Sequence, residues 1–533
     1  MTRQLSQAGM RELLSGPGEF AFLDVREQGV HARGHPFHAC SAPLSHLETM
    51  VADLVPRRTV PVVLFDNGDE GLTDRAAGRL ADAGYADLSV LEGGCTGWEA
   101  SGGELFSGVN VPSKAFGEYI EHRFQTPAIG PEELKAMLDR GEPVVVLDSR
   151  PYDEYHRMTI PGSTDVPGAE LVYRVHDLLP DTDPLVVVNC AGRTRSIIGC
   201  QSLRNAGIPN RVAALTNGTM GWEIAGFGCE RGATRVAVPP SERGYAMAVA
   251  AADRIAKRFG VEFVGGEIVR AWQRDTARTL FLLDVRTREE FEAGRIAGSR
   301  HAPGGQLVQA TDEYIGVRNA RIVLIDSAGV RSVLTAAWLN QLGLKDVYVL
   351  KPEGDDGFAG WATERGQRRP ARLGFSRWPT LQAGELQRML GRDEAAVIDL
   401  SSSLSFRNGH VPGAWWGVRS RLEEAYATLP AAKRLVLTSP DGVLAHYAAP
   451  EAAELWQSST IRVLEGGNSG WLDAGLPFET GTDRSTTTLD DIWYRPYQRA
   501  EDYERHARDY LAWEVALLEQ IKRDPTVAFR DYS

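Results

Sequence analysis

One pattern recurs four times along this 533-residue chain and constrains its fold more than any other feature. Each copy has a short apolar strand that ends in aspartate, a second apolar strand, and a Gly-Trp pair beyond a third. The leading aspartate and the residue that follows the second strand are Asp24 and Asp66, Asp148 and Cys190, Asp284 and Asp326, and Asp399 and Ser439. Because these pairs lie 42, 42, 42 and 40 positions apart, we predict four copies of one domain of about 110–130 residues.

Helical and strand patterns alternate within each copy. In the second copy, residues 131–140 and 194–206 have helical patterns, and an apolar run covers residues 144–148. A continuous apolar run is typical of a strand that is covered on both faces. Alternating strands and helices predict the α/β fold class. We therefore expect four tandem domains, each a mainly parallel sheet flanked by helices, together with a helical C-terminal tail.

The repeats are expected at residues 1–106, 127–232, 261–368 and 369–482. Linkers cover residues 107–126 and 233–260, the second containing a helix, and the tail 483–533 has a helical pattern over 500–522. Sites in parallel sheets lie at the carboxyl ends of strands, so chemistry is expected at the residue after the second strand. Of the four residues there, only Cys190 has a nucleophilic sulfur. We predict that the second repeat is catalytic and that the others, with Asp66, Asp326 and Ser439, are inactive.

Cys190 begins the loop Cys190-Ala-Gly-Arg-Thr-Arg-Ser196, between a strand and a helix. A tight loop that leads into a helix directs backbone N–H groups into one concavity, which stabilises an anion and favours a thiolate. Arg193 and Arg195 add positive charge, and a guanidinium group can hold a sulfonate or sulfate-like group through paired hydrogen bonds. We therefore predict Cys190 as the nucleophile. The predicted substrate-binding residues are Ala191, Gly192, Arg193, Thr194, Arg195 and Ser196.

A thiolate beside two arginines suits a small, anionic, electrophilic partner, and thiosulfate fits that description. Attack on its outer sulfur releases sulfite and leaves a persulfide on Cys190, which the same N–H groups stabilise. A thiophilic acceptor such as cyanide or a small thiol then removes the sulfur, which predicts ping-pong kinetics. Asp148 and Arg150 form an Asp-x-Arg pattern that the first three copies share. We expect them to be a buried ion pair that supports the loop from below.

The repeats resemble rhodanese homology domains over nearly the whole chain except the linkers and the tail. The residues that carry the resemblance are Leu147-Asp-Ser-Arg150, Ile160-Pro-Gly162, the loop from Cys190 to Ser196, Asn217-Gly-Thr-Met-Gly-Trp222 and, in the fourth copy, Gly409-His-Val-Pro-Gly-Ala414. The resemblance implies a multidomain, rhodanese-related thiosulfate sulfurtransferase with one competent domain. Cys190 would carry the persulfide, and residues 191–196 would cradle it. The family often has Gly-His before Ile-Pro-Gly, but the second copy has Met158-Thr159 there, so His156 is given no catalytic role.

Two other functions are weighed against sulfur transfer. Cysteine phosphatases and arsenate reductases related to this fold use a Cys-x5-Arg loop, which surrounds a tetrahedral oxyanion. Cys190 and Arg195 form the shorter Cys-x4-Arg, which favours sulfur transfer because pocket size limits the anion that fits. The other alternative is a non-catalytic scaffold, or a persulfide relay or sensor that depends on a partner, because duplicated domains often lose chemistry and keep their packing surfaces.

Composition narrows the expected partners and location. A net charge of −13 argues against binding to nucleic acid or to an anionic membrane, and no apolar run approaches the ~18 residues of a membrane helix. Five cysteines and an N-terminus without a signal-peptide core indicate a cytoplasmic protein without a disulfide framework. No Cys-x-x-Cys or His-x-x-x-His spacing suggests a metal, and no cofactor is expected.

The expected partners are a small anionic sulfur donor and a thiol or cyanide acceptor. Thiosulfate, 3-mercaptopyruvate and a protein persulfide remain open as donors. The physiological acceptor, the role of the tail and the oligomeric state, with a homodimer as one option, also remain open.

Overall fold

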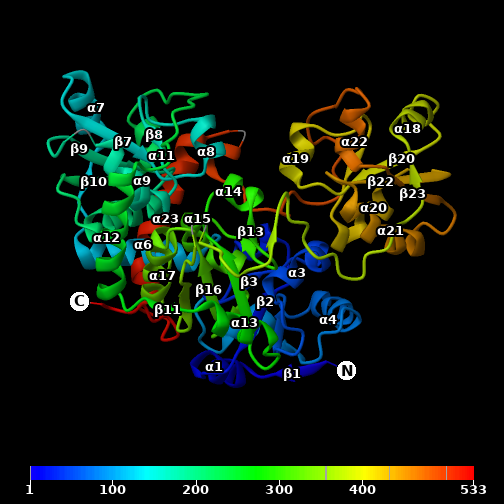
Figure 1. Ribbon diagram of the computed structural model, residues 1–533. Coiled ribbons are helices and arrows are strands. Elements are labelled where there is room, and N and C mark those ends of the chain that lie inside the picture. Colours follow the sequence, from blue (N-terminus) through cyan, green and yellow to red (C-terminus); the bar gives the residue numbers. More distant parts are fainter. Residues whose placement is uncertain (1, 180, 355–356, 431, 500, 533) are drawn as a thin grey trace.

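The computed structural model describes residues 2–179, 181–354, 357–430, 432–499 and 501–532. Four sheets of five or six strands follow one another along the described chain, one for each predicted repeat, and helices flank each of them (Figure 1). A further two-stranded sheet pairs β13 (Arg295–Ile296) with β18 (Thr363–Glu364). The prediction of an α/β fold with four repeated domains and a helical C-terminal segment is confirmed.

The second repeat shows the plan that the others follow. Its strands lie in the order β6 (Ala128–Ile129), β10 (Val212–Leu215), β9 (Leu185–Asn189), β7 (Val144–Asp148) and β8 (Thr164–Asp165), and all neighbours are parallel. The central strand β9 is an apolar run that is buried along its whole length, as expected where helices cover both faces. Its helices are α7 (Pro131–Asp139), α8 (Tyr152–Arg157), α9 (Glu170–Leu178), α10 (Thr194–Ala206) and α11 (Gly218–Ile224).

The other three repeats have the same strand order. The first contains β1 (Arg3–Leu5), α1 (Gln7–Ser15), β2 (Phe20–Asp24), β3 (Cys40–Ser41), α3 (Leu47–Leu54), β4 (Val62–Phe65), α4 (Leu72–Asp82), β5 (Leu88–Leu91) and α5 (Gly94–Ala100). The third contains β11 (Glu262–Val264), α13 (Gly266–Arg274), β12 (Leu280–Asp284), α14 (Arg288–Ala293), β14 (Arg300–His301), α15 (Gly304–Gln309), β16 (Arg321–Ile325), α17 (Val330–Leu342) and β17 (Val347–Leu350). The fourth contains β19 (Thr380–Leu381), α18 (Ala383–Leu390), β20 (Ala396–Asp399), α19 (Ser403–Asn408), β21 (Trp415–Trp416), α20 (Leu422–Thr428), β22 (Arg434–Thr438), α21 (Val443–Leu455), β23 (Thr460–Leu464) and α22 (Gly467–Asp473).

The Gly-Trp pairs are packing features. Trp98, Trp222 and Trp471 lie in the short helices α5, α11 and α22, and each is almost fully buried. Each indole N–H donates to a backbone carbonyl six residues later, at 2.9–3.1 Å. The buried ring thus fixes the chain that leaves the helix, because a buried indole N–H needs an acceptor.

The first sheet contains a strand from the third repeat. β15 (Val317–Arg318) pairs antiparallel with β2, so that Val317 lies opposite Ala21 and Arg318 opposite Phe20. The edge of the first sheet is therefore completed by residues that lie almost 300 positions further along the chain.

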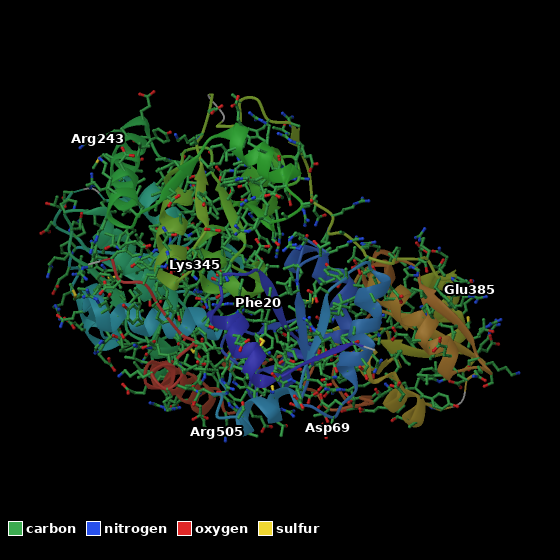
Figure 2. All side chains as sticks on the ribbon, turned by 90° about the horizontal axis from the view of Figure 1, so that it is seen from below. Phe20, Asp69, Arg243, Lys345, Glu385 and Arg505 are labelled. Atoms are coloured by element: carbon green, nitrogen blue, oxygen red, sulfur yellow. The ribbon has the colours of Figure 1, made fainter. Side chains whose placement is uncertain are left out.

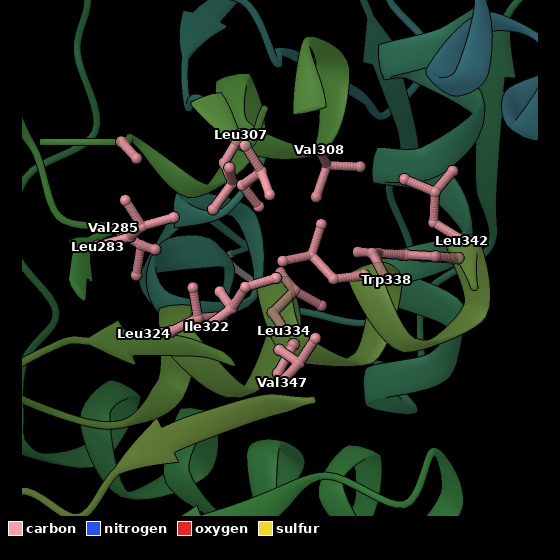
Figure 3. Packing of buried hydrophobic residues seen from close by; sticks show 14 of the residues in the cluster. Leu283, Val285, Leu307, Val308, Ile322, Leu324, Leu334, Trp338, Leu342 and Val347 are labelled. Atoms are coloured by element: carbon pink, nitrogen blue, oxygen red, sulfur yellow. The ribbon is translucent and has the colours of Figure 1, made fainter. Parts of the chain in front are cut away.

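The fourth repeat is a lobe with its own core. In Figure 2, Glu385 of this repeat and Lys345 of the third repeat lie on opposite sides of Phe20, which belongs to the first. One continuous apolar core joins the first three repeats, whereas two separate clusters serve the fourth. Figure 3 shows part of the shared core, to which Leu283, Leu307, Leu334 and Trp338 belong.

Two linker helices and one tail helix pack on the repeats. They are α6 (Val111–Phe124), α12 (Glu242–Arg258) and α23 (Tyr503–Ile521). The helical pattern predicted over residues 500–522 corresponds to α23, and its first position lies outside the described residues. α23 lies against α6, where Leu517 and Val111 share an apolar cluster. In the described part of the chain, no helix is long and apolar enough to cross a bilayer.

Candidate active site

Cys190 lies where the sequence predicts chemistry, between the carboxyl end of β9 and the first turn of α10. Cys190 is 2% exposed, yet it lines a pocket of about 100 Å³ and so is not sealed in a core. The Cys190 Sγ lies 3.5 Å from Ser196 Oγ, and the Ser196 hydroxyl donates to the Arg193 carbonyl at 2.7 Å. The Ser196 hydroxyl is therefore a hydrogen-bond partner of the Cys190 thiol. The residues from Ala191 to Arg195 line the pocket together with Cys190.

In the first and third repeats, the corresponding loops donate backbone N–H hydrogen bonds to the side chain that occupies the position of Cys190. The Asp66 carboxylate accepts hydrogen bonds from the backbone N–H groups of Gly68 at 2.7 Å and Leu72 at 3.2 Å. The Asp326 carboxylate accepts two, from the Ala328 N–H at 3.3 Å and from the Arg331 N–H at 2.8 Å. In both loops the N–H groups converge on an anion, as expected at the start of a helix. In the second repeat, Cys190 directly follows β9, just as Asp66 follows β4 and Asp326 follows β16.

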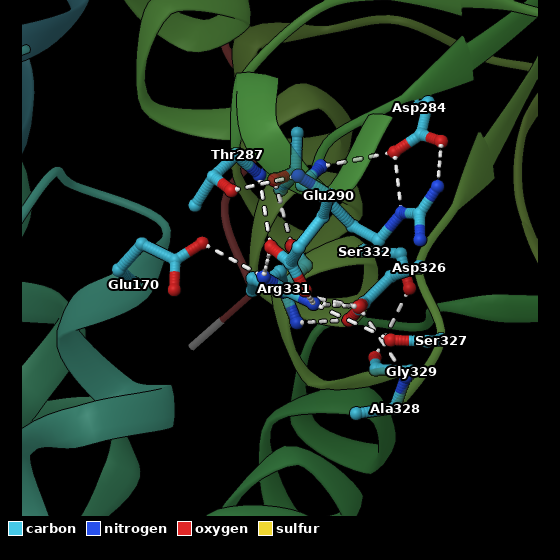
Figure 4. Close-up of polar contacts among 12 residues, drawn as sticks. Glu170, Asp284, Thr287, Glu290, Asp326, Ser327, Ala328, Gly329, Arg331 and Ser332 are labelled. Carbon is cyan, nitrogen blue, oxygen red and sulfur yellow. Dashed lines mark hydrogen bonds and ion pairs between the residues drawn. The ribbon is translucent and has the colours of Figure 1, made fainter. Parts of the chain in front are cut away.

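In the third repeat, the side chain of Arg331 occupies the loop next to Asp326 (Figure 4). Arg331 is fully buried and corresponds to Arg195 by its spacing from the strand. Its guanidinium group donates to Asp326 at 2.8 Å, to Glu290 at 2.6 Å and to Glu170 of the second repeat at 3.0 Å. This loop therefore joins the second and third repeats through buried charges. In the fourth repeat, the equivalent position holds Ser439, whose Oγ accepts from the Ala445 N–H at 3.3 Å.

Both arginines of the Cys190 loop are held by carboxylates. Arg193 donates from Nε to Glu118 at 2.7 Å and also pairs with Glu121, and both glutamates belong to α6. Arg195 donates to both carboxylate oxygens of Glu154, at 3.0 and 2.8 Å. Burial alone would raise the pKa of Glu154, but Arg195 and Arg495 lower it to about 2. Each guanidinium group thus lines the pocket with much of its charge already neutralised.

Asp148 and Arg150 form the buried ion pair below the loop. Arg150 donates from Nε and Nη2 to the two Asp148 oxygens at 2.9 and 2.7 Å. Asp148 also accepts from the Asn189 side chain at 2.9 Å. Because Asn189 directly precedes Cys190, the pair fixes the end of the strand that carries the thiol. His156 lies apart from this pocket, with Nδ1 at 3.0 Å from the Ala233 carbonyl.

Sequence reasoning missed the walls that other parts of the chain add to the pocket. The third repeat contributes Gln306, Gln309 and Glu313, the linker contributes Lys114, and the tail contributes Trp493, Arg495, Tyr497 and Tyr510. These residues follow no local pattern that would identify them from the sequence. Within the described ranges, no cluster of three or more His, Cys, Asp or Glu side chains is arranged to hold a metal ion.

The tail helix α23 reaches the loop through Glu514, which is fully buried. One Glu514 carboxylate oxygen accepts from Thr194 Oγ1 at 3.2 Å and pairs with Lys114 Nζ at 2.7 Å. A Cβ added at Gly192 would lie 3.0 Å from the other oxygen, so the close approach favours glycine there. The tail thus covers and fixes the loop that holds Cys190.

Comparisons with known proteins agree with this geometry. A crystal structure of thiosulfate sulfurtransferase from Pseudomonas aeruginosa is 44% identical, covers 99% of both chains and has a TM-score of 0.94. A curated relative, the HTH-type transcriptional regulator Rv0324 of Mycobacterium tuberculosis, is 35% identical over 107 residues, which make up 20% of this chain and 46% of that protein. The chain therefore spans less than half the length of this curated relative.

The family model for the rhodanese-like domain matches four times, at residues 6–101, 130–225, 267–364 and 382–474. Each match lies on one of the four sheets. The resemblance noted in the sequence is thereby confirmed, and the chain belongs to the rhodanese-like domain family.

Proposed function

We propose that this protein transfers sulfane sulfur from thiosulfate to a thiophilic acceptor through a persulfide on Cys190. The observation that carries the proposal is the placement of Cys190. It is the one residue of the four equivalent positions that has a sulfur, and its loop is of the kind that directs N–H groups onto an anion in the first and third repeats. The 44% identity to a thiosulfate sulfurtransferase supports the choice of donor.

The proposed reaction has two steps. The Cys190 thiolate attacks the outer sulfur of thiosulfate, the S–S bond of the donor breaks, and sulfite leaves with the bonding electron pair. The enzyme then holds Cys190–S–S⁻, whose charge the loop N–H groups stabilise. Cyanide or a small thiolate attacks the terminal sulfur and releases the Cys190 thiolate. The second product is thiocyanate or a small persulfide.

The size of the pocket supports a small donor and a small acceptor. About 100 Å³ accommodates an ion such as thiosulfate but is below the usual range for drug-sized ligands. A protein persulfide would have to reach a residue that is 2% exposed and covered by the tail. We therefore favour direct catalysis over a relay that depends on a partner protein. The five cysteines are all free thiols, which suits the reducing cytoplasm that we propose as its location.

We propose that the first, third and fourth repeats do not carry sulfur. Asp66 and Asp326 already satisfy their loop N–H groups with their own carboxylates, and Ser439 offers only a hydroxyl. The arginines of the Cys190 loop then act mainly by ordering it, because Glu118, Glu121 and Glu154 hold their guanidinium groups.

The test compares Cys190→Ser with Cys229→Ser, which changes a half-buried thiol outside the pocket. We expect the wild-type protein and Cys229→Ser to form sulfite from thiosulfate plus cyanide, and Cys190→Ser to form none. Mass spectrometry after thiosulfate alone should find about 32 Da added to the peptide that contains Cys190. Sulfite formation by Cys190→Ser at the wild-type rate would exclude the proposed carrier.

A further inference from the structure

A second cavity, of about 580 Å³, lies between the first repeat, the third repeat and the C-terminal segment. It shares no lining residue with the Cys190 pocket. Its walls come from residues near β3, from the stretch around β15 and from residues 523–529. Its size falls in the range that small-molecule sites occupy, and sulfur transfer makes no use of it.

Arg318, on β15, points its guanidinium group at this cavity without an acidic partner. Its Nη1 lies 2.6 Å from His38 Nδ1, and its Nε is buried without a hydrogen-bond partner. Among the described residues, no carboxylate lies within ion-pair distance of this group, whereas most other buried arginines here have one. Arg318 is half-buried and its Nε is buried, so leaving its charge without an acidic partner costs free energy that a bound anion would reduce.

His38, the hydrogen-bond partner of Arg318, carries no charge at pH 7. Burial and the nearby Arg318 lower the pKa of His38 to about 3, so the ring is neutral at pH 7. Its Nε2 lies 3.0 Å from the Thr526 carbonyl and therefore carries the proton, while Nδ1 accepts from Arg318. Arg318 thus keeps its positive charge without a direct ion pair among the described residues, although Asp312 and Asp524 also line the cavity.

A second unsatisfied group faces the same space. Asp524 is buried and lines the cavity. Its Oδ1 accepts from the Thr526 N–H and hydroxyl, at 2.8 and 2.7 Å, but its Oδ2 has no partner. Apolar side chains fill much of the remaining wall, among them Phe37, Ile315 and Phe529. Among the described residues, the lining therefore offers a guanidinium group without an acidic partner, a carboxylate oxygen of Asp524 without a hydrogen-bond partner, and an apolar surface. Other charged side chains of the lining are Arg11, Lys345, Arg523, Glu104 and Asp312.

We propose that this cavity binds an organic anion with an apolar body. Its anionic group would pair with Arg318, a hydrogen-bond donor on it would reach Asp524, and its apolar part would lie against Phe37 and Phe529. An inorganic anion would leave most of the 580 Å³ and the apolar wall unused. Because three distant stretches of the chain build the site, a bound ligand would also hold them together and raise the melting temperature.

The probe for the test is 8-anilinonaphthalene-1-sulfonate, an aromatic anion, and its uncharged counterpart is N-phenyl-1-naphthylamine. Fluorescence titration of the full chain should give one saturable site for the anion and much weaker binding of the neutral compound. Arg318→Met should weaken binding of the anion at least about 10-fold, since a hydrogen-bonded ion pair typically contributes that much. Arg392→Met, which removes an exposed arginine of the fourth repeat, is the matched control and should bind normally.

A second variant and a folding control separate loss of binding from loss of folding. Ala528→Trp, which adds bulk at an exposed position of the wall and leaves Arg318 in place, should also weaken binding. The melting temperature of each variant without probe shows whether it is folded. Equal binding by Arg318→Met and Arg392→Met, equal binding of the neutral compound, or full displacement of the probe by millimolar sulfate would each overturn the proposal. None of these results depends on whether Cys190 carries sulfur.

Discussion

Asp165, at the end of β8, is a carboxyl group that folding keeps from ionising. It is 2% exposed, and its Oδ1 has no hydrogen-bond partner. Burial and the neighbouring Asp148 raise the pKa of Asp165 to about 8. The folded protein therefore keeps a proton there between about pH 4 and pH 8, where the unfolded chain has lost it.

The sign of the resulting pH dependence follows from proton counting. Since the folded state binds more protons in this window, the contribution of Asp165 to stability falls as pH rises from about 4 to about 8, by at most about 1.4 kcal/mol per pH unit. Asp165→Asn supplies a neutral side chain of the same shape, so it should flatten this slope and stabilise the protein most at pH 8. Urea denaturation at pH 5, 6.5 and 8 measures the effect. An unchanged slope in Asp165→Asn would show that Asp165 is ionised in the folded state.

At the same scale, sequence reasoning found Cys190 but not its surroundings. Cys190 was predictable because the equivalent positions of the other three repeats hold residues without sulfur. The glutamates that hold Arg193 and Arg195 were not, since Glu118 lies 75 positions from Arg193 and such a contact leaves no local pattern. The sequence therefore predicted the positive charge of the two arginines but not the carboxylates that pair with them.

Among the elements, the tail helix α23 contacts the active-site loop directly. Glu514 on this helix is a positioning residue, because it contacts Thr194 and Lys114 but not the reacting sulfur. Glu514→Ala would leave the Lys114 charge without its partner and should cost about 3–5 kcal/mol. We expect a lower melting temperature and a reduced kcat for sulfite formation.

The neighbouring residue Val515 provides the control, since it lies on the same helix and is 50% exposed. Val515→Ala should change both quantities little. Glu514→Gln keeps the hydrogen bond to Thr194 and should restore part of kcat, which a purely structural defect would not do. If Glu514→Ala and Val515→Ala give the same kcat, α23 does not position the loop.

The elements themselves were largely predictable. The patterns placed α10 and the strand β7 at their observed limits, because buried parallel strands are unbroken apolar runs and Gly207 ends the helix. β15 was not predicted, because a two-residue strand depends on its neighbour rather than on its own sequence.

The whole molecule consists of three repeats around one core and a fourth that is attached through polar contacts. Arg419 of the fourth repeat pairs with Glu48 of the first at 2.9 Å, and Arg79 pairs with Glu451 at 2.7 Å. We expect calorimetry to show two transitions, one of them for the fourth repeat, because separate cores unfold as separate cooperative units.

Arg419→Met should lower only the transition of the fourth repeat, because it removes one of the two arginines, Arg79 and Arg419, that pair with both Glu48 and Glu451. Arg392→Met, on the surface of the same repeat, is the control and should leave both transitions in place. A single transition that shifts as a whole in Arg419→Met would mean that all four repeats unfold together.

The strand that the third repeat adds to the first sheet has a consequence for synthesis on the ribosome. Arg318 is translated 294 residues after Asp24, which at roughly 5–20 residues per second is a delay of roughly 15–60 s. During that time the Phe20–Ala21 half of β2 has no partner on one edge. Unpaired edges invite wrong pairing, so the nascent chain needs protection until the third repeat emerges.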